Sequence, residues 1–239
     1  MAGKVFDGQL ALVTGASRGI GAATAVALAE AGAHVILTAR SVKELEAVED
    51  RIHEVGGTST IAPLDLSEPD GIARLAAAVA GRWDALDIMV INAALLPQLG
   101  PVTQIDPSAY GKAITVNLLA TQALLAAFDP MLKRSQNARV IGLTSSVGEQ
   151  PRPYWGAYGS TKAAFDCLLG TYAQEVERIS EIRVAIVDPG ATRTKMRANA
   201  YPGEDPATVK PPEEVAQSLM ALLQRDFSSP HRERVETLR

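Results

Sequence analysis

The chain has 239 residues, of which 47% are hydrophobic and 21% charged, and its net charge is −4. This composition predicts a folded globular protein, and the negative charge gives no reason to expect nucleic acid or an anionic membrane as a partner. No apolar run approaches the length of a membrane span, and the N-terminus shows no apolar signal core. The single cysteine, Cys167, excludes an intrachain disulfide and lies in AAFDCLLG, which predicts a buried structural thiol in a cytoplasmic protein.

Short apolar runs alternate with helical stretches along the chain. Between the runs lie Ala-rich or Leu-rich segments with helical spacing, such as GIGAATAVALAEAG. Continuous apolar strands that alternate with helices are typical of parallel strands covered on both faces. The sequence predicts an α/β fold, a single-domain Rossmann-like doubly wound parallel sheet flanked by helices, over residues 1–239. The predicted strands are 10–15, 34–39, 58–63, 87–92, 138–145 and 183–188.

The first predicted strand runs directly into the glycine-rich segment TGASRGIG, and a helical stretch follows at once. Glycines permit a tight turn and let backbone N–H groups approach a pyrophosphate at the positive end of a helix. The spacing TGxxxGxG differs from the more common GxGxxG. Its place between a strand and a helix favours dinucleotide binding over a purely structural turn. The loop residues predicted to contact the cofactor are Gly15, Ser17, Arg18, Gly19, Ile20 and Gly21.

The second predicted strand ends in LTARS, where enzymes that use NAD commonly carry an acidic residue for the ribose 2′-OH. Arg40 stands there instead, and its guanidinium could pair with a 2′-phosphate. Arg18 could supply a second cation. We therefore expect NADP(H) as the cofactor, with NAD(H) as the alternative, unless Arg40 is an ordinary solvated arginine.

Polar residues also follow the third and fourth predicted strands. Asp65, next to Leu66, could accept a hydrogen bond from the adenine amino group, or it could cap the next helix. Asn92, followed by Ala93, is expected to fix the backbone around the cofactor, or to be a turn residue. We count all four as predicted cofactor contacts.

Tyr158 and Lys162, in the segment YGSTK, are four positions apart and share one face of a helix. A free phenol has a pKa of about 10, and lowering it to about 7 requires roughly 4 kcal/mol. A unit charge at about 4 Å supplies roughly that much at an effective dielectric constant of about 20. The pair could therefore tune a phenol for proton transfer, although alone it could be a surface pair.

Six motifs occur in order: TGxxxGxG at 14–21, NAA at 92–94, VNL at 116–118, TSS at 144–146, YGSTK at 158–162 and DPG at 188–190. Together they resemble the short-chain dehydrogenase/reductase family over most of the chain. The resemblance implies that Tyr158 exchanges a proton with the substrate and that Lys162 also binds the nicotinamide ribose. Ser145, 13 positions before Tyr158 and chosen over Ser146 by that spacing, would bind the substrate oxygen. Asn117 would hold a water that links Lys162 to solvent.

The same resemblance assigns roles to the segment after the sixth strand, DPGATRT. Pro189 and Gly190 would shape a bend, Thr192 would contact the nicotinamide carboxamide, and Thr194 would contact the phosphates or the amide. The alternative for both threonines is helix capping. Residues 192–212 carry four prolines and lack periodicity, which predicts a substrate lid or an ordinary ordered loop. Residues expected near the substrate are Leu95, Leu96, Gln150, Trp155, Met196 and Tyr201, and no metal site is predicted.

The sequence departs from the family pattern at two places. Ala94 replaces a glycine, and the C-terminus lacks the glycine-rich last strand that often joins a tetramer interface, although a short strand around RVETL, 234–238, is possible. We therefore expect a homodimer through the helices of Asn117 and Tyr158 and leave a tetramer open. The expected function is NADP(H)-dependent interconversion of a carbonyl and a secondary alcohol. The alternative is a non-catalytic dinucleotide-binding sensor or partner subunit.

Overall fold

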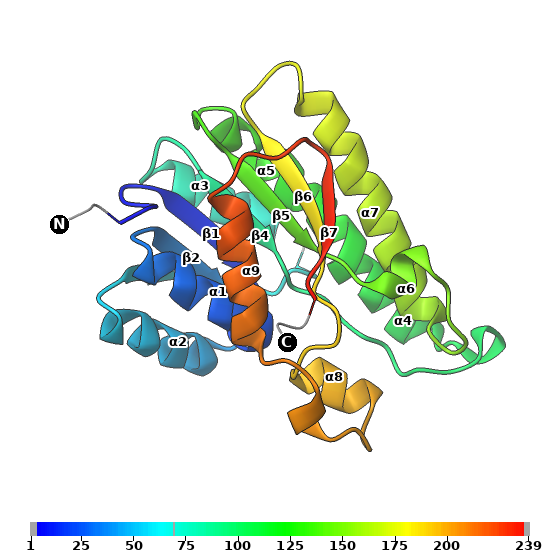
Figure 1. Ribbon diagram of the computed structural model, residues 1–239. Helices are drawn as coiled ribbons and strands as arrows, with labels where there is room; N and C mark the ends of the chain where they lie inside the picture. Colours follow the sequence, from blue (N-terminus) through cyan, green and yellow to red (C-terminus); the bar gives the residue numbers. More distant parts are fainter. Residues whose placement is uncertain (1–3, 69, 237–239) are drawn as a thin grey trace.

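A computed structural model describes residues 4–68 and 70–236 of the chain (Figure 1). Its centre is one sheet of seven parallel strands in the order β3-β2-β1-β4-β5-β6-β7. The strand order reverses between β1 and β4, and open α/β sheets bind ligands outside the carboxyl ends of strands at such a point. The doubly wound parallel sheet is therefore confirmed. The strands are β1 (Leu10–Thr14), β2 (His34–Thr38), β3 (Thr58–Ile61), β4 (Ile88–Ile91), β5 (Arg139–Leu143), β6 (Arg183–Asp188) and β7 (His231–Arg234).

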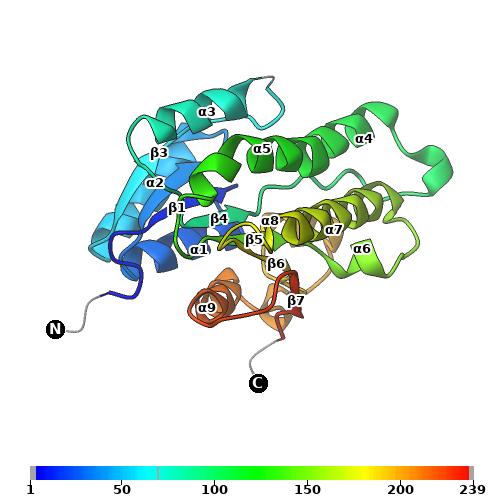
Figure 2. The same cartoon turned by 90° about the horizontal axis from the view of Figure 1, so that it is seen from above.

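Helices connect the strands and cover both faces of the sheet, as Figure 2 shows. Those on or beside the two faces are α1 (Gly19–Glu30), α2 (Val42–Glu54), α3 (Gly71–Ala80), α4 (Pro107–Ile114), the π turn η2 (Thr115–Leu119), α5 (Ala120–Leu132), α7 (Gly156–Val176) and α9 (Pro212–Leu223). The short helices in the connections are η1 (Val102–Gln104), α6 (Ser146–Glu149), α8 (Lys195–Ala200) and η3 (Pro206–Thr208).

Side chains of β1 alternate between two hydrophobic cores. Ala11 and Val13 pack with α1, α2 and α9, whereas Leu10 and Leu12 pack with α3, α5 and α7. All five residues of β1 are consequently buried. This double burial is the reason why the strands read in the sequence as unbroken apolar runs.

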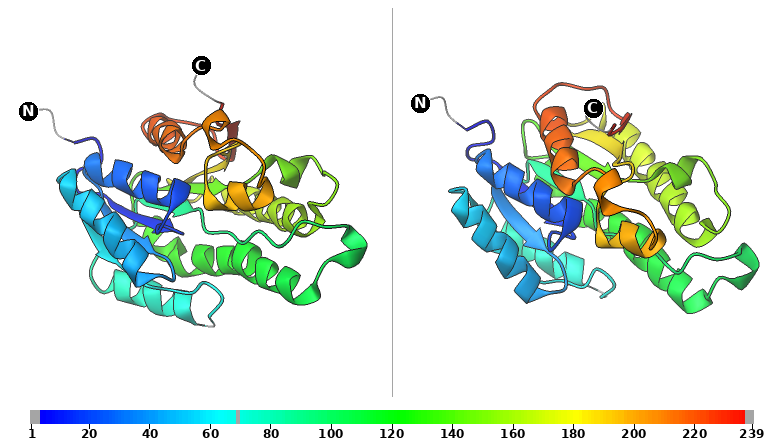
Figure 3. Two further views of the ribbon diagram at one scale, coloured as in Figure 1. Left: turned by 90° about the horizontal axis from the view of Figure 1, so that it is seen from below. Right: turned by 60° about the horizontal axis from the view of Figure 1, so that its bottom comes forward.

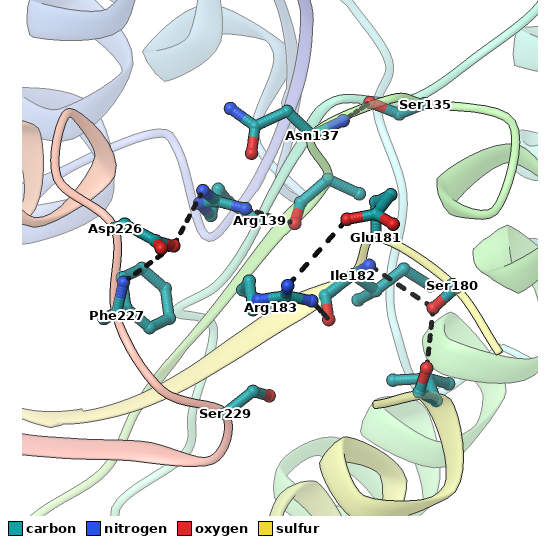
Figure 4. Close-up of polar contacts among 12 residues, drawn as sticks. Ser135, Asn137, Arg139, Ser180, Glu181, Ile182, Arg183, Asp226, Phe227 and Ser229 are labelled. Atoms are coloured by element: carbon teal, nitrogen blue, oxygen red, sulfur yellow. Dashed lines mark hydrogen bonds and ion pairs between the residues drawn. The ribbon is translucent and has the colours of Figure 1, made fainter. Parts of the chain in front are cut away.

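A polar cluster closes the amino ends of β5 and β6 (Figure 4). Arg139 and Arg183 begin these strands and lie opposite each other in the sheet. Arg139 is only 7% exposed, lies 3.9 Å from Asp226, and stands over the Phe227 ring, 5.3 Å from its centroid. Burial lowers the pKa of Arg139, and the charge of Asp226 opposes that effect. The cluster therefore holds a buried cation at the end of the sheet opposite the glycine loop.

The last strand lies earlier in the chain than predicted. β7 pairs with β6 from Ala185↔His231 to Asp188↔Arg234, so it shares only Arg234 with the segment 234–238, where the sequence allows a short strand. Residues 237 and 238 of that segment lie outside the described residues. The Ser229 hydroxyl accepts a hydrogen bond from the Val184 N–H at 3.0 Å, which fixes the chain beside β6 before the predicted strand begins.

Cys167 is exposed, so its predicted burial is wrong. The buried residues of the carboxyl half of α7, including Phe165, Leu169 and Tyr172, recur at helical spacing and face the sheet. Cys167 falls between them on the other face of the helix, because apolar neighbours in the sequence are not neighbours on a helix surface.

The continuous helical stretch Pro107–Leu132 contains an 18-residue window with a mean hydropathy of 1.3, and by length and composition alone it could cross a membrane. Polar residues such as Asn117 and Thr121 interrupt it, which is why the sequence shows no unbroken run. Only 39% of its most apolar window is buried, although Leu124 and Phe128 belong to the core under the sheet.

Candidate active site

The glycine loop joins β1 to α1, and its backbone angles or close packing favour glycine at three positions. Gly15 and Gly19 have φ angles of 65° and 55°, in the left-handed region that favours glycine. A Cβ added at Gly21 would lie 2.3 Å from the Gly15 carbonyl oxygen and 2.5 Å from Asn92 Nδ2. Packing within the turn itself therefore requires glycine, and it leaves the amino end of α1 bare of side chains at these positions.

Asn92 holds the glycine loop from the end of β4. Its amide Nδ2 donates to the carbonyls of Thr14 at 2.9 Å and Gly15 at 3.2 Å. The Thr14 hydroxyl in turn accepts from the backbone N–H groups of Asn92 and Ala93, at 3.0 and 3.1 Å. Asn92 thus fixes the backbone of the glycine loop. The sequence interpretation missed the role of Thr14, although a polar residue at the end of a buried strand was a usable signal.

The two predicted cations differ in their surroundings. Arg18 donates to both carboxylate oxygens of Glu44, at 2.8 and 2.6 Å, and this hydrogen bond is the largest cause that lowers the pKa of Glu44. Arg40 is exposed, and across residues 4–68 and 70–236 it has no ion pair within 4.0 Å. Arg40 is thus open to a ligand, whereas Arg18 would have to leave the carboxylate of Glu44 before it could bind one.

Asp65 forms a local turn after β3. It accepts hydrogen bonds from the backbone N–H and the hydroxyl of Ser67, at 2.9 and 2.7 Å, and these lower its pKa. Asp70, not Asp65, occupies the cap position of α3. The helix-cap alternative for Asp65 is therefore wrong, while its predicted contact with adenine stays a prediction. Leu66 packs against the core beneath α3.

Tyr158 and Lys162 lie on the buried face of α7, with exposed fractions of 7% and 2%. The surface-pair alternative is therefore wrong. Lys162 Nζ donates to the Leu143 carbonyl at the end of β5, 2.6 Å away, and lies 5.9 Å from the centroid of the Tyr158 ring. Burial lowers the pKa of Lys162 to about 8, with Asp166 opposing that change.

The pKa of Tyr158 moves opposite to the expectation from the sequence. Burial raises the pKa of this phenol, and the negative charges of Asp188 and Asp166 raise it further. Burial disfavours the charged phenolate and is the largest cause of the rise, and the expectation from Lys162 alone left it out.

Two adjacent serines follow β5, and their contacts distinguish them. Ser146 Oγ accepts a hydrogen bond from Arg152 at 2.9 Å. Ser145 is half-buried, and its hydroxyl has no hydrogen-bond partner within the part of the chain that the structure describes. Of the two, Ser145 therefore has the hydroxyl that remains available, in agreement with the choice made by spacing.

Asn117 stands on the π turn η2 and is 1% exposed. Its side chain accepts from the Leu95 N–H at 2.7 Å and donates to the Leu95 carbonyl at 2.9 Å and the Thr161 hydroxyl at 3.0 Å. Its own carbonyl accepts from Thr121 at 3.1 Å. The side chain thus ties the segment after β4 to α7, next to Lys162.

Asp166 lies one helical turn beyond Lys162 and escaped the sequence interpretation, although its i+4 spacing on the same face was a usable signal. Its side chain is 9% exposed, and Arg232 of β7 donates to its Oδ2, with Nη1 at 3.0 Å. Burial raises the pKa of Asp166, while Thr144, Arg232 and Lys162 oppose the rise. A buried carboxylate therefore adjoins both predicted proton-transfer groups.

The segment after β6 turns sharply at Gly190, whose φ is 64° and whose N–H donates to Asp188 Oδ1 at 2.9 Å. Thr192 is buried, and its hydroxyl donates to the carbonyls of Pro189 and Gly190, both at 3.2 Å. Thr194 caps α8 by accepting from the Arg197 N–H at 3.1 Å. The capping alternative is thus observed for Thr194 and not for Thr192.

Residues 192–212 form an ordered excursion whose ends meet in a bridge between Thr192 and Lys210. Figure 3 shows α8 of this segment lying near the carboxyl ends of the strands, between α1 and α7. A cavity of about 420 Å³ lies between the segment and the glycine loop, with Gly19 on one side and Tyr201 and Val209 on the other. Among the residues predicted near the substrate, Gln150 is exposed, whereas Leu95, Leu96, Trp155, Met196 and Tyr201 are half-buried.

A family model for short chain dehydrogenases matches residues 9–205 of this chain. The chain belongs to the short chain dehydrogenase family. The resemblance seen in the sequence is thus confirmed, and as a member of this family the protein is an oxidoreductase. The oxidoreductase YciK of Escherichia coli (strain K12) is 34% identical over 225 residues, which cover 93% of this chain and 88% of that protein.

Solved structures of other short chain dehydrogenases resemble this one closely. One from Pseudomonas syringae has a TM-score of 0.94 at 36% identity and covers 98% of this chain and 97% of that one. One from Shigella flexneri, complexed with NADP, has a TM-score of 0.92 at 32% identity and covers 98% of this chain and 99% of that one.

Proposed function

We propose that this short chain dehydrogenase interconverts a carbonyl and a secondary alcohol with NADP(H), and that Tyr158 is its general acid and base. The observation that carries the proposal is the pairing of a buried phenol and a buried ammonium on α7, where the ammonium contacts Leu143, two residues before the available hydroxyl of Ser145. Such a group of donors suits a carbonyl oxygen that gains negative charge.

The residues near the glycine loop fit a dinucleotide. The turn of Gly15, Gly19 and Gly21 would hold the pyrophosphate against backbone N–H groups, because side chains have no room there. Arg40 would pair with a 2′-phosphate, and Arg18 would join it on leaving Glu44. The NADP complex of the Shigella flexneri structure supports this choice over NAD(H). The remaining proposed contacts are Ser17, Ile20, Asp65, Leu66, Asn92, Ala93, Tyr158, Lys162, Pro189, Gly190, Thr192 and Thr194.

The bound cofactor would supply a hydride to the carbonyl carbon. The carbonyl π electrons then move to oxygen, which takes the proton of the Tyr158 hydroxyl, so that an alcohol and the oxidised cofactor leave. Ser145 would donate a hydrogen bond to that oxygen. Lys162 would hold positive charge beside the phenolate, and the relay water assigned to Asn117 would return the proton. Oxidation of the alcohol runs through the same groups in reverse.

The test is a panel of ketones, aldehydes and quinones with NADPH and NADH in parallel. We expect loss of NADPH absorbance with at least one carbonyl and a slower reaction with NADH. Tight NADPH binding without turnover on any carbonyl would instead favour a non-catalytic sensor or partner subunit. The presence of Asn117, Ser145, Tyr158 and Lys162 together supports the enzyme, since a sensor does not require all four.

We also propose a homodimer through the helices that carry Asn117 and Tyr158. Within one chain these helices contact each other, and the Tyr110 hydroxyl of α4 lies 2.8 Å from Ser160 Oγ of α7. Leu119 of the π turn is 56% exposed, so its apolar side chain is open to a second copy of the chain. Light scattering should give twice the chain mass, and a monomer mass would contradict the proposal.

A further inference from the structure

Three aromatic side chains lie in contact from the proposed catalytic phenol to the segment 192–212. The Trp155 ring stands 6.1 Å from the Tyr158 ring, centroid to centroid, at an interplanar angle of 62°. The Tyr201 ring lies 5.9 Å from the Trp155 ring at 34°. We call Trp155 and Tyr201 the aromatic wall. One end of this wall therefore adjoins Tyr158, and its other end belongs to the excursion after β6.

The wall lies outside the two hydrophobic cores under the sheet. Trp155 and Tyr201 are half-buried, and neither belongs to either core. The chain has only two tryptophans and five tyrosines, so aromatic residues are scarce, and one tryptophan and two tyrosines meet here. Their concentration beside a proton donor indicates a surface for a ligand as much as a packing contact.

The backbone is shaped to present Trp155. Tyr154, the residue before it, has a φ of 73°, which a non-glycine residue adopts only at a cost. Its carbonyl accepts a hydrogen bond from the Gly100 N–H at 3.1 Å, which holds this conformation. Tyr154 itself is 61% exposed. The turn therefore places Trp155 beside α7 while it leaves the adjacent aromatic ring in solvent.

Tyr201, at the other end of the wall, contacts an arginine whose charge is paired with a glutamate. The Arg197 guanidinium lies 3.6 Å from the centroid of the Tyr201 ring and donates to both carboxylate oxygens of Glu204, at 2.7 and 2.6 Å. This ion pair holds the Arg197 guanidinium against the Tyr201 ring. Because Arg197 is paired with Glu204, it is not offered to a carboxylate on a substrate.

We propose that the aromatic wall selects carbonyl substrates that carry a flat conjugated ring next to the C=O group, such as aryl ketones, aryl aldehydes and quinones. The ring would pack on Trp155 and Tyr201 while the carbonyl oxygen reaches the Tyr158 hydroxyl. The inference rests on the proposed function, and the reaction is the same: hydride to carbon, proton from Tyr158 to oxygen. Aromatic contacts of this kind are worth about 2- to 10-fold in binding beyond the area they bury.

The experiment compares NADPH-dependent reduction of acetophenone and of cyclohexyl methyl ketone, which differ only in the saturation of the ring. The readout is the ratio of the two kcat/KM values, and it is the change of this ratio between variants that counts, because the two ketones differ in intrinsic reactivity. Trp155→Ala and Tyr201→Ala should each lower the ratio by about 2- to 10-fold, and Trp155→Phe should largely keep it.

Trp83→Ala is the matched control, since it removes the other tryptophan, which stacks on His34 at the amino end of the sheet, and it should leave the ratio unchanged. Should an alanine variant fail to fold, Trp155→Leu and Tyr201→Leu keep apolar volume and still remove the ring. Turnover with both ketones and an unchanged ratio in every wall variant would overturn the aromatic wall alone. Absence of turnover on every carbonyl would overturn the proposed function, and this inference with it.

Discussion

The two ends of the sheet each bury a cation, and they use it differently. At the amino end, Arg139 is 7% exposed, and its neighbours are an aromatic ring and the carboxylate of Asp226, which is itself 90% exposed. At the carboxyl end, Lys162 is 2% exposed and donates to a backbone carbonyl beside a buried phenol. Burial lowers the pKa of Lys162 to about 8, whereas an arginine stays charged in a protein.

Burial of a charge is therefore not the mark of an active site in this fold. The carboxyl end differs because the pKa of its buried ammonium is lowered to about 8, and because this ammonium contacts the end of β5, which Ser145 follows. The amino end holds a cation that cannot titrate, so we expect it to support stability only. Four substitutions test this contrast.

Tyr158→Phe should have the largest effect, because it removes the proton donor and keeps the ring. We expect turnover to fall by about 10²- to 10⁴-fold with NADPH binding retained, measured by NADPH consumption and by titration of the cofactor. Tyr172→Phe is the control: this second tyrosine of α7 bonds Asp129 at 2.9 Å and should affect stability instead. Equal turnover in wild type and Tyr158→Phe would refute the acid role.

Arg40→Asp should change the cofactor preference at the carboxyl end. Loss of a charge-assisted hydrogen bond to the 2′-phosphate should weaken NADPH binding by about 10- to 100-fold and leave NADH binding nearly unchanged. Titration of both cofactors measures this. Arg51→Asp, on the exposed side of α2, makes the same charge change and should not alter the preference. A similar loss for both cofactors would argue against a phosphate contact.

Arg139→Gln should act at the amino end alone. Removing a buried guanidinium from beside Asp226 and Phe227 should lower the free energy of unfolding by about 1–3 kcal/mol, measured by urea denaturation. At a temperature where the variant is folded, kcat should match that of the wild type. A large loss of kcat there would show that the two ends are coupled.

Asp166→Asn should shift the pH dependence of kcat. The negative charge of Asp166 raises the pKa of Lys162, so its removal lowers that pKa, and activity that needs protonated Lys162 should fall at a lower pH, by about half a pH unit or more. The charged groups that face Asp166 are Lys162 of α7 and Arg232 of β7. The exposed Glu175→Gln on the same helix is the control. A shift to higher pH would contradict this role.

The sequence predicted the inner strands well because strands such as β1, β4 and β5 are buried on both faces, so that local apolar runs carry the signal. It missed the true position of β7, whose segment HRER is polar and alternates between half-buried and exposed residues, as an edge strand does. It also missed contacts between residues far apart in the chain. The ion pair between Arg18 and Glu44, for example, follows from how α1 and α2 lie together and not from any local pattern.

The sequence predicted which residue types form the site and how they are spaced along the chain, but it did not predict what surrounds each side chain. The spacing of Ser145 and Tyr158 separated Ser145 from Ser146, and the hydrogen bond of Ser146 to Arg152 agrees with that choice. The direction in which the pKa of Tyr158 moves could not be predicted, because it depends on burial and on Asp188, which lies at the end of β6 and far from Tyr158 in the sequence.

The π turn at Thr115–Leu119 has a consequence for how the chain tolerates changes of length. A π turn closes its hydrogen bonds over five residues instead of four, so it holds one residue more than a regular helix would. Deleting one residue there would regularise the helix and rotate Asn117 by about 100° about its axis. That rotation would carry Asn117 away from Leu95 and Thr161 and so detach the end of β4 from α7. A single in-frame codon deletion in this apolar helix should therefore be more harmful than most substitutions.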